Sequence, residues 1–147
     1  LERDIAALDF VPDAIVASFH GMPQRTLELG DPYHCHCQKT ARLLSEKMGR
    51  ELVVAFQSRF GRAKWLGPAT DTVLEALAGQ GKKNIAIFAP GFSSDCLETC
   101  EELAIRGKEQ FISGGGEKFA YLPCLNDSEA GIDMLETLVR RELAGWI

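Results

Sequence analysis

His20 is the residue whose type and position first suggest chemistry in this sequence. It follows a short apolar run and precedes Gly21 and Pro23. An imidazole accepts protons near neutral pH and binds divalent transition metals, while a glycine beside it allows a ligand to approach the backbone closely. The alternative is an imidazole that only forms a hydrogen bond with a neighbouring loop. His20 is therefore a candidate proton acceptor or metal ligand.

A group of acidic residues further along the chain is the second candidate. Glu98 and Glu102 are four positions apart, which places them on one face of a helix. Paired carboxylates at a crevice can bind a divalent cation or relay protons. The alternative is structural, because Asp95 and Glu98 have the spacing of a capping box and acidic residues stabilise helix N-termini.

The cysteines and the remaining histidines form a less convincing metal site. His34, Cys35, His36 and Cys37 alternate, but alternate positions at the start of a helix do not share a face. A second Cys or His pair that would complete a structural zinc set is missing. The 5 cysteines of the chain match neither a disulfide framework nor an iron–sulfur spacing. We interpret this stretch as part of an ordinary helix.

Four short apolar runs predict the strands that must position these residues. They are continuous rather than alternating, which is typical of strands covered on both faces: Ala14–Ser18, Leu52–Phe56, Ile85–Pro90 and Phe119–Leu122. Helical patterns precede, separate and follow them, at Leu1–Leu8, Tyr33–Gly49, Pro68–Gly79, Asp95–Phe111 and Ser128–Leu143. This alternation predicts a three-layer α/β fold, with a four-stranded parallel sheet flanked by helices. By analogy with similar folds, we expect the strand order 2-1-3-4.

The predicted sheet brings the candidate residues to one edge. Ligands of such folds bind beyond the carboxyl ends of the strands, where the strand order reverses. The order 2-1-3-4 would therefore place His20 and the start of the helix at Asp95 in one crevice. On that helix we expect a buried stripe, formed by Leu97, Cys100 and Ala104.

Length and composition limit the class of protein. A chain of 147 residues, 46% hydrophobic and 25% charged, fits one globular domain. Its apolar runs are far shorter than the roughly 20 residues of a membrane span. The net charge of −5 argues against nucleic acid and anionic membrane surfaces as partners. The chain opens on Leu1 without a leader pattern, so we expect a fragment of a longer cytoplasmic protein.

Six motifs in the predicted loops carry a family resemblance that covers nearly the whole chain. In order, they are Ser18–Pro23 (SFHGMP), Gly30–Tyr33 (GDPY), Phe56–Gly61 (FQSRFG), Trp65–Pro68 (WLGP), Pro90–Thr99 (PGFSSDCLET) and Pro123–Ser128 (PCLNDS). Together they resemble the ferrochelatase family, enzymes that insert ferrous iron into a porphyrin. Members have two similar lobes, and residues 1–147 resemble the C-terminal lobe alone. The resemblance implies a single chelatase-like α/β domain of a longer enzyme.

The resemblance also implies roles for particular residues. His20 and Glu98 would be the paired active-site residues that bind the iron, and Glu102 would continue an acidic row along a partly π-type turn. Arg106 stands one turn further on, so this row stops there. Iron would be a substrate rather than a permanent cofactor. Members with a [2Fe-2S] cluster hold it in a cysteine-rich C-terminal extension, which Leu143–Ile147 does not match, so we expect no cluster.

The implied activity is that of a lyase of haem biosynthesis. It inserts ferrous iron into protoporphyrin IX and removes two pyrrole protons, and the partner would be the enzyme's own N-terminal lobe. Arg59 and Arg62 are candidate partners of the propionates, and Trp65 is a candidate wall of the ligand pocket. The isolated 147-residue chain would insert iron poorly, because the other lobe is needed to enclose the ring.

Two other functions remain open at this point. One is a small chelatase that inserts cobalt or nickel into a different tetrapyrrole, although a second histidine is usually expected where Glu98 stands. The other is a non-catalytic module that binds porphyrin or metal through His20, Cys35 and Cys37. The residues do not separate protoporphyrin from coproporphyrin, and they leave oligomeric state and peripheral membrane contact open.

Overall fold

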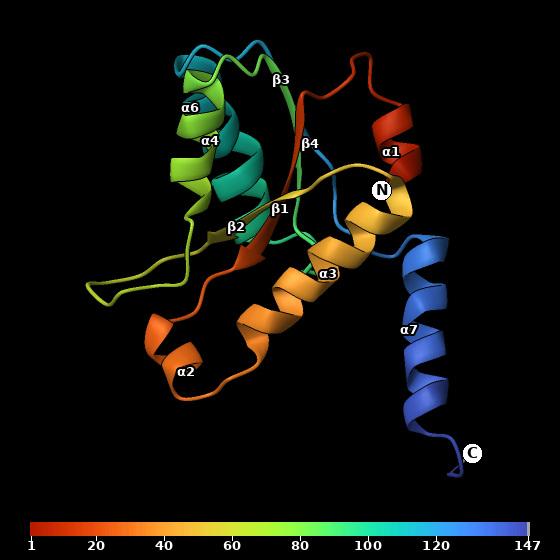
Figure 1. Cartoon of the computed structure of the whole chain (residues 1–147). Helices are drawn as coiled ribbons and strands as arrows, with labels where there is room; N and C mark the ends of the chain where they lie inside the picture. The colour runs from red at the N-terminus through yellow and green to blue at the C-terminus, as the bar shows by residue number, and fades with distance from the viewer. Residues whose placement is uncertain (147) are drawn as a thin grey trace.

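Four parallel strands form one sheet in the order β2-β1-β3-β4 (Figure 1). The computed structural model describes residues 1–146, and Ile147 lies outside this range. The strands are β1 (Ala14–His20), β2 (Val53–Gln57), β3 (Asn84–Phe88) and β4 (Lys118–Tyr121). Val16 of β1 pairs with Val53 on one side and Ile87 on the other. The predicted sheet and its strand order are confirmed.

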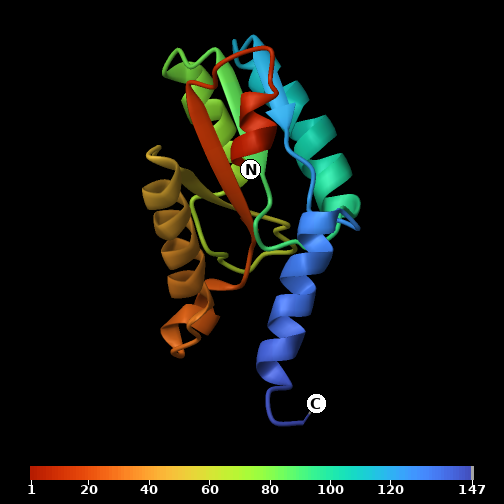
Figure 2. The same cartoon turned by 90° about the vertical axis from the view of Figure 1, so that its right-hand side faces the viewer.

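Helices cover both faces of the sheet. They are α1 (Glu2–Ala6), α2 (Gln24–Glu28), α3 (Tyr33–Met48), α4 (Thr70–Gly79), α5 (Leu97–Thr99), the π-helix η1 (Cys100–Gly107), α6 (Lys108–Ser113) and α7 (Glu129–Glu142). Helices α1 and α3 lie on one face, and α4, η1 and α6 lie on the other (Figures 1 and 2). The sequence did not predict α2, a short helix directly after β1.

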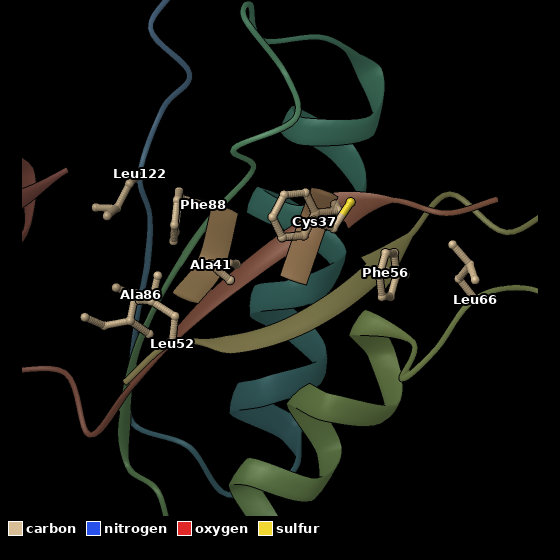
Figure 3. Close-up of a cluster of buried hydrophobic side chains, with 11 residues drawn as sticks. Cys37, Ala41, Leu52, Phe56, Leu66, Ala86, Phe88 and Leu122 are labelled. Atoms are coloured by element: carbon tan, nitrogen blue, oxygen red, sulfur yellow. The ribbon is translucent and has the colours of Figure 1, made fainter. Parts of the chain in front are cut away.

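Each face of the sheet has its own hydrophobic core. Along β1, Ile15 and Phe19 face the α3 side, whereas Val16 faces the α4 side, as the period of two in a strand requires. Figure 3 shows the α3 side, where Cys37 and Ala41 belong to the same buried cluster as the sheet residues. Burial on both faces explains why the strands are continuously apolar and why the sheet is a rigid base for the loops at its edge.

The helix predicted at Asp95–Phe111 is divided into α5, η1 and α6. The expected stripe of Leu97, Cys100 and Ala104 is wrong, because Leu97 is 73% exposed and Cys100 is also exposed. The buried positions are instead four apart: Thr99, Leu103, Gly107 and Phe111. A π-helix carries more residues per turn than an α-helix, so a pattern read with the α-helical period selects the wrong face.

Helix α7 stands apart from the rest of the domain. It extends away from the sheet in both views (Figures 1 and 2), and Gly131 is the one residue of α7 that is buried. Its exposed apolar side chains recur at helical spacing: Ile132, Met134, Leu135, Leu138 and Val139. None of the helices described in residues 1–146 is long and apolar enough to cross a membrane.

Candidate active site

His20 is the last residue of β1 and its ring is held in a defined orientation. Its Nδ1 lies 2.7 Å from the carbonyl oxygen of Gly21. Since a carbonyl only accepts hydrogen bonds, Nδ1 is the donor, so in the neutral imidazole the lone pair lies on Nε2. The Tyr33 hydroxyl donates to the His20 carbonyl at 2.8 Å and fixes the backbone of the same residue. Histidines that bind metals are commonly oriented in this way, by a carbonyl that takes the other ring N–H.

The backbone beside His20 runs unusually close to β2. The N–H of Gly21 donates to the carbonyl of Gln57 at 2.7 Å. A Cβ at position 21 would lie 2.6 Å from that same oxygen, which is closer than real Cβ atoms come. The glycine is therefore required by the close approach of two strand ends, and it holds His20 against the edge of β2.

Glu98 lies in the short helix α5, which reaches the same edge of the sheet. The cap of α5 is formed by Cys96 and Thr99, with the Cys96 N–H donating to the Thr99 hydroxyl at 2.9 Å. The alternative in which Asp95 and Glu98 form the capping box is therefore wrong, because Thr99 takes the position that Glu98 would have filled. The Glu98 carboxylate is not needed by the cap.

The charge state of Glu98 suits cation binding. Its pKa lies below the ordinary value, mainly because the carboxylate accepts a hydrogen bond from Cys96, and the nearby charge of His20 lowers the pKa further. Glu98 is thus ionised at neutral pH. The backbones of these two predicted site residues are linked through Gln57, which pairs with His20 in the sheet and donates a side-chain hydrogen bond to the Glu98 carbonyl at 2.7 Å.

A second network anchors the start of α5 to the loop after β4. The Asp95 carboxylate accepts hydrogen bonds from the Tyr121 hydroxyl at 2.6 Å, from Asn126 Nδ2 at 2.7 Å and from the Thr99 hydroxyl at 3.0 Å. Burial raises the pKa of Asp95, but these hydrogen bonds outweigh burial and lower the pKa to about 2. Asp95 is therefore a fixed anion that positions α5.

The thiol of Cys124, 3.5 Å from the Tyr121 hydroxyl of this network, is not a ready metal ligand. The pKa of Cys124 is raised to about 11, and burial is the main cause. Metals bind the thiolate form of cysteine, so a thiol that stays protonated at neutral pH competes poorly for a cation.

The Glu102 carboxylate is bound by Ser58, the residue directly after β2. Its Oε1 accepts the N–H of Ser58 at 2.9 Å, and its Oε2 accepts the Ser58 hydroxyl at 3.1 Å. Ser58 has a positive φ of 61°, a conformation that is strained for a residue with a side chain. Arg106, one turn further on, pairs with Glu101 at 2.7 Å.

A cavity of about 660 Å³ opens beside the two glutamates. Glu98 and Glu102 line it together with Trp65 and Phe60, whereas His20 is not among its lining residues. Trp65 is therefore part of a pocket wall, as predicted. Arg59 also lines the cavity, but its guanidinium is paired with Asp71, which leaves it less available to a propionate.

The stretch from His34 to Cys37 forms the first turn of α3 and its side chains diverge. Cys37 is buried in the core, and burial raises its pKa. Cys35 and His36 are exposed, and the His34 ring stacks on Phe56 at 5.6 Å. All five cysteines are free thiols. In residues 1–146, no group of three or more His, Cys, Asp or Glu side chains is placed to hold a metal ion.

The structure adds positioning residues that sequence reasoning did not find. Tyr33, Gln57 and Ser58 all fall inside the motifs of the resemblance, yet no role was assigned to them. Gln57 carried one usable signal, because an amide at the end of an apolar strand must find partners when it is buried.

The fold is of a known class, the chelatase-like α/β fold. The structure is similar to that of a protein from Marinobacter aquaeolei named as a cobalamin (vitamin B12) biosynthesis CbiX protein, with a TM-score of 0.62. The match covers 88% of this chain and 96% of that chain at 14% sequence identity, so it defines the fold alone.

The sequence comparisons identify the family within this class. The family model for ferrochelatase matches residues 2–143, and this chain belongs to the ferrochelatase family. It is 53% identical to a ferrochelatase of Agrobacterium fabrum and 55% identical to one of Rhizobium meliloti. Both matches cover 100% of this chain but 44% of the relative. The chain therefore spans less than half the length of the curated relatives it matches.

Proposed function

We propose that the protein carrying this chain inserts ferrous iron into protoporphyrin IX to give haem, with removal of two pyrrole protons. The observation that carries this proposal is the link through Gln57 between His20 and Glu98, two candidate ligands of a divalent cation, in a chain of the ferrochelatase family. In this role His20 and Glu98 are the catalytic and metal-binding residues, and the enzyme is a lyase.

The chemistry of the substrate explains why such a pair is needed. A free porphyrin must lose two N–H protons before four nitrogens can bind the cation. His20 is suited to accept a proton through Nε2, since Nδ1 is already occupied by the Gly21 carbonyl. Glu98 offers carboxylate oxygens to the ferrous ion and balances charge as the protons leave.

The same pair accounts for release of the metal. One imidazole and one carboxylate bind Fe²⁺ with moderate strength, whereas a set of thiolates would retain it. Iron is accordingly a substrate of the reaction, and the proposal includes no permanently bound cofactor.

The remaining length of the relatives supplies the proposed partner. Because this chain spans 44% of their length, we assign the missing wall of the porphyrin site to an N-terminal lobe of the same protein. The exposed apolar face of α7 supports a further packing partner of this kind. Five free cysteines support the cytoplasm as the compartment, since thiols persist there in reduced form.

A second candidate is insertion of cobalt or nickel into a different tetrapyrrole. The likeness to the CbiX protein favours it, but that likeness concerns the fold alone, and a carboxylate stands at Glu98 where a second histidine is expected. A non-catalytic porphyrin-binding module is the third candidate.

An anaerobic metal screen with the full-length protein separates these candidates. Fe²⁺, Co²⁺ and Ni²⁺ are each offered with protoporphyrin IX, a coproporphyrin or a cobalamin-type tetrapyrrole precursor, and insertion is followed by the shift of the porphyrin absorption bands. We expect the fastest turnover with Fe²⁺ and protoporphyrin IX. Faster cobalt or nickel insertion into the precursor would support the second candidate, and porphyrin binding without turnover would support the third.

A further inference from the structure

Gln57 occupies a central position between the two halves of the site. It is the last residue of β2, it is 1% exposed, and the parallel register places it opposite His20 of β1. Its carbonyl accepts the N–H of Gly21 at 2.7 Å. The backbone of Gln57 is thus bonded to the residue next to His20, at the point where the two strands end.

The side chain of Gln57 bonds to the other half of the site. Its Nε2 donates to the backbone carbonyl of Glu98 at 2.7 Å, and its Oε1 accepts the Ser18 hydroxyl at 2.8 Å. The Ser18 hydroxyl also lies 2.8 Å from the Thr70 hydroxyl. The orientation of the amide is determined by its partners, because the reverse orientation would set its oxygen against the Glu98 carbonyl.

This bond is significant because α5 is the first turn of a longer helical stretch that continues directly into η1 and α6. The end of a helix frays more readily than its middle, so the position of this turn is sensitive to the groups that anchor it. Asp95 anchors the start of α5 to the loop after β4. Gln57 anchors it on the opposite side, to the strands that carry His20. Among residues 1–146, every buried side-chain nitrogen and oxygen has a hydrogen-bond partner, so this network is complete.

We propose that Gln57 is a positioning residue that sets the separation of His20 and Glu98, and thereby the affinity of the site for its divalent cation. The inference rests on the proposed function, in which these two side chains bind the same ion. Gln57 itself does not touch the metal or the porphyrin. Partners of metal ligands typically contribute about 10- to 100-fold to metal affinity or activity.

The test compares two substitutions in the same buried network of the full-length protein. Gln57→Met keeps the length and volume of the side chain but removes the hydrogen bond to the Glu98 carbonyl. Thr70→Val removes a hydroxyl from the network but leaves that bond in place. Both variants lose buried hydrogen bonds and are expected to melt at lower temperature, so thermal stability does not distinguish the two roles.

Metal affinity does distinguish them. We expect Gln57→Met to raise the KM for Fe²⁺ by about 10- to 100-fold with little change in the KM for porphyrin, and Thr70→Val to leave both constants close to wild type. A titration with Co²⁺ alone, followed by its visible absorption in the absence of porphyrin, should show the same weakening. Equal metal affinities in the two folded variants would overturn the proposal.

A replacement variant and the wild-type control cover the two ways in which this test could fail. Should Gln57→Met fail to fold, Gln57→Asn takes its place, because it retains a buried amide that is too short to reach both Ser18 and Glu98. Gln57→Asn is compared with Thr70→Val in the same way. Equal metal affinities of these two variants would overturn the inference. Absence of iron insertion by the wild-type protein would contradict the proposed function instead, and the Co²⁺ titration would still measure the effect of Gln57.

Discussion

At the scale of single residues, one carbonyl group determines which nitrogen of His20 is available. The Gly21 oxygen takes the Nδ1 proton, so Nε2 is the nitrogen that can accept a proton or bind a cation. Nothing in the spacing of the sequence reveals this choice, because it depends on how the chain turns immediately after β1. The residue type was predictable, whereas the free nitrogen required the structure.

His20→Ala should abolish iron insertion while leaving the fold intact. Loss of a positioned proton acceptor typically lowers turnover by about 10²- to 10⁴-fold. The ring is only partly buried, so we expect the circular dichroism spectrum and the melting temperature to stay close to wild type. Turnover in the full-length protein is the measurement, with His36→Ala as the control because His36 is exposed on α3. Near-normal turnover of His20→Ala would remove His20 from the mechanism.

Gly21→Ala should destabilise the domain by about 1–3 kcal/mol, which is typical of overpacking at a tight contact. The added methyl would lie 2.6 Å from the Gln57 carbonyl, so the strand ends must separate. Urea unfolding measures the change in the free energy of unfolding. Gly79→Ala is the control, since a Cβ there meets nothing within 4 Å and alanine favours a helix. Equal stability of the two variants would contradict the account of this close approach.

At the scale of elements, the strands and most helices were predictable and the π-helix was not. Continuous apolar runs identified the four strands, and the helix expected over Tyr33–Gly49 matches α3, which is capped at its end by Gly49 with a φ of 61°. The stripe expected at Leu97, Cys100 and Ala104 was wrong because it assumed the α-helical period through η1. The resemblance did indicate a π-type turn, which the structure confirms at Cys100–Gly107.

Asp95 makes a prediction about acid stability. Because its pKa is about 2 in the folded state and its ordinary value is 3.8, its ionised form stabilises the fold above about pH 4. That contribution is lost as the pH falls toward 2. Asp95→Asn should cost about 2 kcal/mol at pH 7, a size usual for hydrogen bonds to a charged group.

Urea unfolding of wild type and Asp95→Asn at several pH values checks this prediction. The difference in the free energy of unfolding should shrink between about pH 4 and pH 2, because wild type loses what the variant already lacks. Asp133→Asn is a suitable control, since Asp133 is exposed on α7. A difference that stays constant with pH would show that the Asp95 carboxylate does not anchor α5 as a charged group.

At the scale of the whole molecule, two observations fit the proposed second lobe: the exposed apolar face of α7 and the partial coverage of the relatives. The apolar face of α7 is exposed in residues 1–146, although such a face ordinarily packs against another element. The chain spans 44% of its relatives' length, and the cavity beside Glu98 is open. The sequence could predict a longer protein through its resemblance, but only the structure reveals which surface is left uncovered.

The 147-residue chain alone should insert iron poorly or not at all. We expect turnover at least 10²-fold below that of the full-length protein, because the ring is not enclosed and oriented toward His20 and Glu98. The two proteins are compared in the same anaerobic assay, after circular dichroism has verified that the isolated chain is folded. Full-length-like turnover by the 147-residue chain would contradict the need for a second lobe.

The central claim is that His20 and Glu98 bind one ferrous ion together. Crystals of the full-length protein soaked anaerobically with Fe²⁺, with data collected at the iron absorption edge, test it most directly. The account predicts one anomalous peak within coordination distance of both His20 Nε2 and a Glu98 carboxylate oxygen, and loss of that peak in His20→Ala. A peak that contacts neither side chain, or that persists unchanged without the imidazole, would contradict it.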